Sequence, residues 1–266
     1  MRNADREFQR LNSQLTMKKI AYFTYGVVSY ALFFGTYCYA AGFVTNLVVP
    51  TSLDGPPKSS VLQSFLTNAL LLLLFAVQHS VMARPAFKAW WTRIVPEPIE
   101  RSTYVLFSSV CMILLLGLWE PMGGVIWSVE ATAFRIALNA LSFLGFGIVL
   151  LNTFMINHFD LFGLRQVWFY LRGETYQPLK FRTPFFYKHV RHPLYLGWII
   201  AFWAAPTMTI AHLLFAALCT AYILTAIRFE ERDLIRTFGE KYIAYKRNAP
   251  MLIPFTKSKN KSQALR

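Results

Sequence analysis

The sequence predicts an all-α membrane protein, a polytopic helical bundle, from three observations. Of its 266 residues, 55% are hydrophobic and only 15% are charged, whereas soluble domains carry about 25% charged residues. Four apolar runs of about the 20 residues that a bilayer core requires lie in the first 155 residues, and a longer run follows later. Lys and Arg outnumber Asp and Glu by 27 to 13, and the cations gather in particular connecting segments. Charge distributed in this way indicates membrane topology, so we expect the lipid bilayer as a partner and no nucleic acid.

Four membrane helices are expected before residue 156. They cover residues 20–43, 62–82, 103–119 and 133–155. Residues 1–19 are polar, and they form either a helix on the membrane surface, with Phe8 and Leu11 on its apolar face, or a solvated tail. The chain therefore divides into an N-terminal tail (1–19), a four-helix membrane region (20–155), a C-terminal region (156–254) and a basic disordered tail (255–266).

The cations sort the connecting segments between the two sides of the membrane. Of the 27 Lys and Arg residues, 25 lie in residues 1–19, 83–102, 156–193 and 228–266. Under the positive-inside rule these segments, and both termini, are cytoplasmic. The apolar run 194–227 must then return to the side on which it starts. We expect either a tight helical hairpin that turns near Pro206 or, alternatively, one long tilted helix.

Polar residues gather just before this last apolar run. His189, Arg191 and His192 precede Pro193, which disfavours helical geometry at His192 and suits the first turn of a helix. A helix that begins there offers free N–H groups and a positive dipole end to an anion. Gly197 would let another backbone or a ligand approach closely. Anchoring of these side chains at the membrane interface explains the same pattern, and both interpretations stay open.

Two adjacent carboxylates, Glu230 and Glu231, lie at the other end of the run. Carboxylates so near a membrane are unfavourable unless they are paired. Arg228 lies three residues before Glu231, so an ordinary helical ion pair is available. The functional interpretation is that one carboxylate accepts hydrogen bonds from ribose hydroxyls or an ammonium group.

The C-terminal motifs together resemble those of a known superfamily. They read Arg191-His192-Pro193-x-Tyr195-x-Gly197, Glu230-Glu231 and Tyr242-x-x-Tyr245, followed by Pro250 to Pro254. This pattern resembles the signature of integral membrane methyltransferases related to isoprenylcysteine carboxyl methyltransferase. Gln78-His79-Ser80 and the segment that begins Asn157-His158-Phe159-Asp160 resemble the nurim-like branch, and within it the bacterial methanethiol S-methyltransferases. The similarity covers most of residues 20–254.

The resemblance implies methylation of methanethiol to dimethyl sulfide with S-adenosylmethionine as cofactor, in the bacterial cytoplasmic membrane, with the cofactor site on the cytoplasmic side. By position, it implies cofactor binding by His189, Arg191, His192, Tyr195, Gly197, Glu230, Glu231, Tyr242 and Arg247. The methyl group on a sulfonium is already activated, so we expect no metal.

The small thiol substrate is mostly protonated at neutral pH, and its thiolate is the nucleophile. The candidate catalytic residues that would take the proton are His79, His158 and Asp160, at cytoplasmic ends of membrane helices. His158 and Asp160 could meet only if the helix has already ended there. Each also has a structural interpretation. His79 could be a packed histidine bonded to a carbonyl of a neighbouring helix, and His158 and Asp160 could form a helix-ending hydrogen-bond network in which Asp160 accepts from the backbone near Gly163 or from Arg165. A positive site alone could also lower the thiol pKa.

Two other functions fit the sequence less directly. A related membrane enzyme would methylate a bulkier lipophilic acceptor, such as an isoprenylcysteine carboxylate or a lipid amine. A non-catalytic scaffold or a haem or metal carrier would use the histidines, but neither a CxxCH motif nor a pair of histidines on one membrane helix supports haem.

Overall fold

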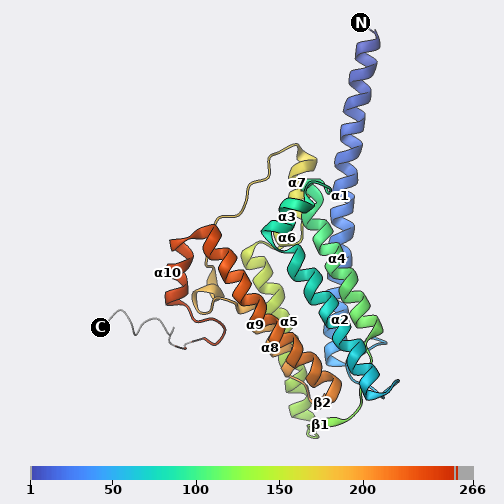
Figure 1. Cartoon of the computed structure of the whole chain (residues 1–266), viewed down its shortest axis with the longest axis vertical. Coiled ribbons are helices and arrows are strands. Elements are labelled where there is room, and N and C mark those ends of the chain that lie inside the picture. Colours follow the sequence, from blue (N-terminus) through green and yellow to red (C-terminus); the bar gives the residue numbers. More distant parts are fainter. Residues whose placement is uncertain (1, 255, 257–266) are drawn as a thin grey trace, which may run out of the picture. The chain divides into compact units, whose positions relative to one another are not determined.

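The computed structural model describes residues 2–254 and 256, and within them the protein is mainly helical (Figure 1). The α-helices are α1 (Arg2–Thr45), α2 (Val61–Met82), α3 (Pro85–Trp91), α4 (Glu97–Leu118), α5 (Thr132–Ile156), α6 (His158–Leu161), α7 (Leu164–Arg172), α8 (Pro193–Trp203), α9 (Ile210–Phe238) and α10 (Glu240–Asn248). A 3-10 helix covers Phe185–Lys188, and two short strands are β1 (Val125–Ser128) and β2 (Thr207–Thr209). Five helices in this part of the chain, α1, α2, α4, α5 and α9, are long and apolar enough to cross a membrane. The predicted all-α polytopic bundle is confirmed. The predicted tail 255–266 lies, except for residue 256, outside the described residues.

The chain divides into two compact units. Among the described residues, unit 1 contains 2–38, 77–113 and 157–179, and unit 2 contains 39–76, 114–156, 180–254 and 256.

All four predicted membrane helices are present, and two of them begin earlier than hydropathy indicates. The helix expected from residue 20 is part of α1, which is already helical at Arg2. Helix α4 begins at Glu97 rather than at residue 103. Its first turn holds Pro98, Glu97 and Glu100, residue types that suit a helix N-terminus because the ring has no N–H to satisfy and the carboxylates face the positive end of the dipole.

The last apolar run is a hairpin, and the alternative of one long helix is wrong. Helix α8 ends at Trp203, β2 follows, and α9 begins at Ile210. Helix α8 has only 11 residues and spans about 16 Å, so this arm is shorter than a bilayer core. Helix α9 continues to Phe238 and so includes Glu230 and Glu231. The chain turns at Pro206, as predicted, because proline cannot donate the next helical hydrogen bond.

Helix α5 packs closely against α8 in unit 2, as Figure 1 shows. Gly145 of α5 faces Gly197 of α8, and a Cβ on Gly145 would lie only 2.7 Å from the Gly197 carbonyl oxygen. Ser142 donates a hydrogen bond across the same contact to the Ala201 carbonyl, at 2.8 Å. Small residues therefore set the distance between the two helices, as is typical of membrane helix pairs.

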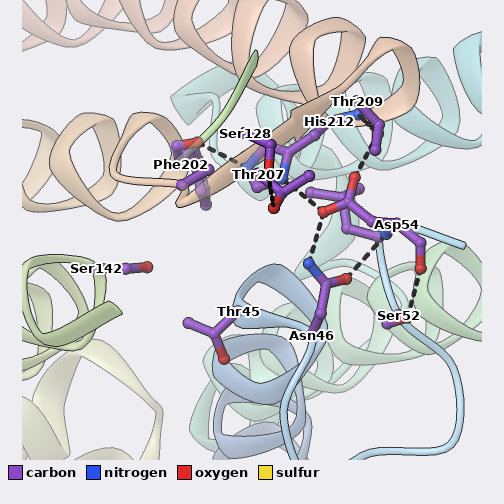
Figure 2. A network of polar contacts seen from close by, with 12 residues as sticks. Thr45, Asn46, Ser52, Asp54, Ser128, Ser142, Phe202, Thr207, Thr209 and His212 are labelled. Carbon is purple, nitrogen blue, oxygen red and sulfur yellow. Dashed lines mark hydrogen bonds and ion pairs between the residues drawn. The ribbon is translucent and has the colours of Figure 1, made fainter. Parts of the chain in front are cut away.

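A polar network at the start of α9 fixes the turn of the hairpin (Figure 2). Asp54, from the loop between α1 and α2, accepts a hydrogen bond from Thr209 and lies 3.1 Å from Nδ1 of His212. The His212 Nε2 donates to the Phe202 carbonyl at 2.9 Å, and Asn46 donates to Asp54 at 2.5 Å. Strand β2 also pairs with β1 in an antiparallel ladder. The sequence predicted neither the ladder nor this network.

The core of unit 1 is built from large apolar and aromatic side chains. Met82, Tyr104 and Val105 are buried at its centre, and Phe33 and Phe162 pack against them. The rings of Phe33 and Phe162 stack with centroids 3.8 Å apart. The contact ties α6 and the turn after it to α1, and so positions the segment that carries His158 and Asp160.

Candidate functional site

The N-terminus of α8 forms the centre of a buried ionic cluster in unit 2. Pro193 is the first residue of α8 and His192 is its N-cap, as the sequence predicted. The Arg191 guanidinium donates from Nε to Glu231 at 2.7 Å, and from one η nitrogen to the carbonyl oxygens of Lys246 and Ala249. The backbone N–H groups of Arg191 and His192 donate to Pro250 and Met251. These bonds join the start of α8 to α9, to the last turn of α10 and to the segment after α10.

Glu231 is the acceptor that unites this cluster. One carboxylate oxygen takes hydrogen bonds from Arg191 and from the His192 Nε2, the latter at 3.1 Å, and the other lies 2.6 Å from the Lys246 ammonium. Its side chain is only 8% exposed. The partners therefore come from the two residues before α8 and from α10, and not from Arg228, which precedes Glu231 on the same helix. A buried carboxylate is tolerated here because three positive or hydrogen-bonding groups surround it.

Two polar atoms beside this cluster are buried without a hydrogen bond to any described residue. They are the hydroxyl oxygen of Tyr242 and one carboxylate oxygen, Oε2, of Glu230. Tyr242 is 1% exposed, and burial raises the pKa of its hydroxyl, so the group stays a neutral donor. Glu230 Oε2 lies 3.8 Å from the His192 ring. A buried donor and a buried acceptor without hydrogen-bond partners leave a bonding capacity that a ligand or an ordered water can satisfy.

The other predicted cofactor residues have different surroundings. The Tyr195 ring lies beside the His192 ring, with centroids 5.6 Å apart. Gly197 faces the backbone of α5, so the close approach predicted for it is that of another helix. His189 follows the 3-10 helix and is exposed, and Arg247 is exposed on α10.

His158 and Asp160 lie in unit 1, on the short helix α6. Helix α5 ends at Ile156, and Asn157 caps α6 by accepting from the Asp160 N–H. The helix has thus ended before this pair, which is the condition set by the sequence. His158 is 2% exposed, its Nε2 lies 2.8 Å from the Tyr30 hydroxyl, and burial lowers its pKa below 6.5. A lowered pKa keeps the ring neutral and able to accept a proton at physiological pH.

Asp160 and His79 have hydrogen-bonding partners in the same unit. Asp160 accepts from Arg165 and from the Tyr176 hydroxyl, both at 2.9 Å. The bond from Arg165 is the one that the structural interpretation predicted. His79 at the end of α2 lies 2.9 Å from the Tyr104 hydroxyl of α4 and 3.2 Å from Ser108. The contact to the neighbouring helix is again present, made by side chains rather than by a carbonyl.

Comparison with curated proteins decides the family. The chain is 53% identical over 236 residues to a methanethiol S-methyltransferase of Crocosphaera subtropica, which covers 89% of this chain and 92% of that protein. It is 51% identical over 239 residues to a methanethiol S-methyltransferase of Mycobacterium tuberculosis, over 90% and 98% of the two chains. The chain belongs to the methanethiol S-methyltransferase family.

The family is related more distantly to nurim. Nurim of Rattus norvegicus is 31% identical to this chain over 233 residues, 78% of this chain and 87% of nurim. The resemblance to bacterial methanethiol S-methyltransferases and the more distant resemblance to nurim are therefore confirmed. No protein-family model matches the chain, and no solved structure matches it.

Sequence reasoning missed two groups of polar residues in this member of the methanethiol S-methyltransferase family. Lys246 pairs with Glu231, but one lysine among several basic residues of 241–247 carries no signal of its own. Tyr30 and Tyr176 contact His158 and Asp160, yet each lies far from its partner or in a loop. For Lys246, the only signal in the sequence was that it directly follows the motif Tyr242-x-x-Tyr245.

Proposed function

We propose that this protein transfers the methyl group of S-adenosylmethionine to methanethiol and forms dimethyl sulfide. The observation that carries the proposal is the identity of 44–53% to six proteins named methanethiol S-methyltransferase, over 89–97% of this chain. Their names state the transfer of a methyl group to a thiol. S-adenosylmethionine supplies a methyl group on a positively charged sulfur, which makes it a direct donor.

The polar residues of unit 2 fit this cofactor. The Oε2 atom of Glu230 is a buried acceptor on a side chain that is 42% exposed, and the Tyr242 hydroxyl is a buried donor. Neither has a hydrogen-bond partner among the described residues. We propose that Glu230 takes the ribose hydroxyls or the ammonium group, and that Tyr242 donates to an acceptor on the cofactor. Arg191 and Lys246 compensate Glu231, and with it they hold the free N–H groups at the start of α8 in place for the cofactor carboxylate.

We further propose that His158 takes the thiol proton. Its lowered pKa keeps it unprotonated, and the contact of Nε2 with Tyr30 at 2.8 Å fixes the orientation of the ring. Asp160 is committed to Arg165 and Tyr176, so its proposed contribution is to position α6 rather than to accept a proton. His79 remains a second candidate acceptor.

The distribution of cations supports a location in the cytoplasmic membrane with both termini inside. Segments between membrane helices alternate between several cations and at most one, and the membrane potential and insertion machinery place the basic segments in the cytoplasm. A water-soluble cofactor then meets the basic side, and methanethiol, which is small and apolar, reaches the protein through the bilayer.

The direct test is incubation of the purified protein with S-adenosylmethionine and methanethiol, followed by detection of dimethyl sulfide in the headspace. We expect product with methanethiol and none with an isoprenylcysteine carboxylate or a lipid amine. Glu231→Ala and His192→Ala should abolish cofactor binding in calorimetry. Cofactor binding without dimethyl sulfide would reject the thiol acceptor, and unchanged binding in both variants would reject the proposed cofactor residues.

A further inference from the structure

An open cavity of about 510 Å³, lined mostly by charged and polar residues, lies in unit 1. It is lined by α3, the first turns of α4, helices α6 and α7, and residues 174–176. Of the residues proposed above for the reaction, only Asp160 reaches it. The cavity therefore needs an explanation of its own.

Two cations on the wall of this cavity have unused donors. Lys88 forms neither a hydrogen bond nor an ion pair through its ammonium group with any residue from 2 to 254. Arg101 donates from Nε to the Leu161 carbonyl at 2.7 Å, and its guanidinium stacks over the Tyr104 ring. Its η nitrogens donate to none of the described groups. Burial and the nearby Arg101 lower the pKa of Lys88, whereas the nearby Glu100 and Asp160 raise it. The unused donors of Lys88 and Arg101 suit an anionic group.

Two buried oxygen atoms in the same cavity lack hydrogen-bond donors among the described residues. Oε1 of Glu100 and Oε1 of Gln166 are buried, and neither accepts a hydrogen bond from the part of the chain described here. The other end of the Gln166 amide is fixed, because it donates to the Asp160 carbonyl at 3.2 Å. Buried oxygens of this kind require N–H or O–H donors. A ligand that satisfies the cavity thus carries an anion and hydrogen-bond donors.

The charged side chains that line the cavity indicate the net charge of the ligand. Four carboxylates line the cavity beside the two cations: Glu97, Glu100, Asp160 and Glu174. Arg165 and Arg172 compensate Asp160 and Glu174. The charges that remain are two carboxylates, Glu97 and Glu100, and two cations, Lys88 and Arg101. They sum to zero, which disfavours a purely anionic ligand and suits a dipolar group of no net charge.

The cavity also lies at the ends of membrane helices. Helix α2 ends at Met82, α4 begins at Glu97, and α3 between them lines the cavity. Trp90 of α3 and Trp168 of α7 are 50% and 46% exposed, and exposed tryptophans mark the level of lipid headgroups in membrane proteins. The source of a dipolar ligand at this level is the membrane itself.

We propose that this cavity binds the headgroup of a zwitterionic phospholipid with a primary ammonium group, phosphatidylethanolamine. The phosphate is held by Lys88 and Arg101, and the ammonium N–H groups by Glu100 and Gln166. A choline headgroup is excluded because its quaternary ammonium has no N–H to donate. The lipid is a bound ligand here and not the methyl acceptor.

Native mass spectrometry of the purified full-length protein tests the proposal, with equal amounts of phosphatidylethanolamine and phosphatidylcholine added. We expect about tenfold more of the ethanolamine adduct, the effect of one charge-assisted hydrogen bond. Lys88→Ala and Glu100→Gln should each reduce that adduct about tenfold. Arg93→Ala removes an exposed cation three residues before Pro96, and it should leave the adduct unchanged.

Equal binding of the two lipids by the unaltered protein would overturn the proposal, and this comparison does not depend on the folding of any variant. Adducts in Lys88→Ala and Glu100→Gln as abundant as in Arg93→Ala would do the same. Glycerophosphoethanolamine supplies the headgroup without acyl chains. Binding of this solute without binding of the diacyl lipid would show a solute site rather than a lipid site.

Discussion

At the scale of single residues, a substitution of Tyr242 distinguishes a role in cofactor binding from a role in stability. The Tyr242 hydroxyl is buried and has no partner among the described groups. Tyr242→Phe should therefore leave the free energy of unfolding unchanged or raise it, because an unsatisfied buried group is removed. If the hydroxyl contacts the cofactor, the Kd for S-adenosylmethionine rises about tenfold. Calorimetry and thermal unfolding of the same samples measure both; an unchanged Kd would remove Tyr242 from the site.

His158 predicts the pH dependence of the reaction. Burial lowers its pKa below the ordinary 6.5, so the neutral ring persists above that pH and is lost only as the pH falls through the lowered value. The acid limb of kcat/KM for methanethiol should accordingly lie below pH 6.5. His158→Gln should lower kcat/KM by about 10²-fold or more and abolish this limb. A limb that survives unchanged in His158→Gln would assign the proton acceptor to another group, with His79 the next to be tested.

At the scale of elements, the contact between α5 and α8 depends on Gly145 and not on Gly147, which lies two residues further along α5. A Cβ on Gly145 would lie 2.6 Å from the Ala201 nitrogen, whereas a Cβ on Gly147 meets nothing within 4 Å. Gly145→Ala should destabilise the protein by about 1–3 kcal/mol through overpacking. Gly147→Ala, two residues away, should be neutral or stabilise by up to about 1 kcal/mol. Unfolding in detergent compares the two, and equal effects would contradict the close packing.

The hairpin turn depends on a different kind of interaction. Asp54 binds Thr209 and His212 at the start of α9 and is 12% exposed. Asp54→Ala leaves a buried histidine without its carboxylate, so we expect a loss of about 3 kcal/mol of stability. Glu130→Ala is the matched control, since Glu130 is exposed and should change stability by less than about 0.5 kcal/mol. Similar midpoints for the two variants in thermal unfolding would show that the network does not hold the turn.

At the scale of the whole molecule, hydropathy and charge predicted the features that depend on neighbouring residues: the membrane helices, the hairpin and the start of α8. The four membrane helices follow from runs of apolar residues, and the hairpin follows from the count of cations on either side of residues 194–227. The hairpin in turn brings His192 and Glu231 together, although 39 residues separate them. Pro193 predicted the start of α8 because its ring has a fixed, local effect on the backbone.

Contacts between distant segments were not predictable in the same way. Asp54 and His212 are 158 residues apart, and neither lies in a pattern that points to the other. The sequence offered a surface helix over residues 1–19 as one alternative, but it did not predict that this helix and the membrane helix form one element, α1, or that α4 begins at Glu97. These turns are polar, and hydropathy detects only the apolar part of a helix. The partners of Glu231 were missed for a related reason, since the nearby Arg228 satisfies the helical spacing and Arg191 does not.

The most direct measurement for the central claim follows the methyl group itself. The purified protein is given S-adenosylmethionine with a deuterated methyl group, together with methanethiol, and headspace gas is analysed by mass spectrometry. We predict dimethyl sulfide that carries one deuterated and one ordinary methyl group, and a strongly reduced yield from Glu231→Ala. Unlabelled dimethyl sulfide, or no dimethyl sulfide from protein that binds the cofactor, would contradict the account.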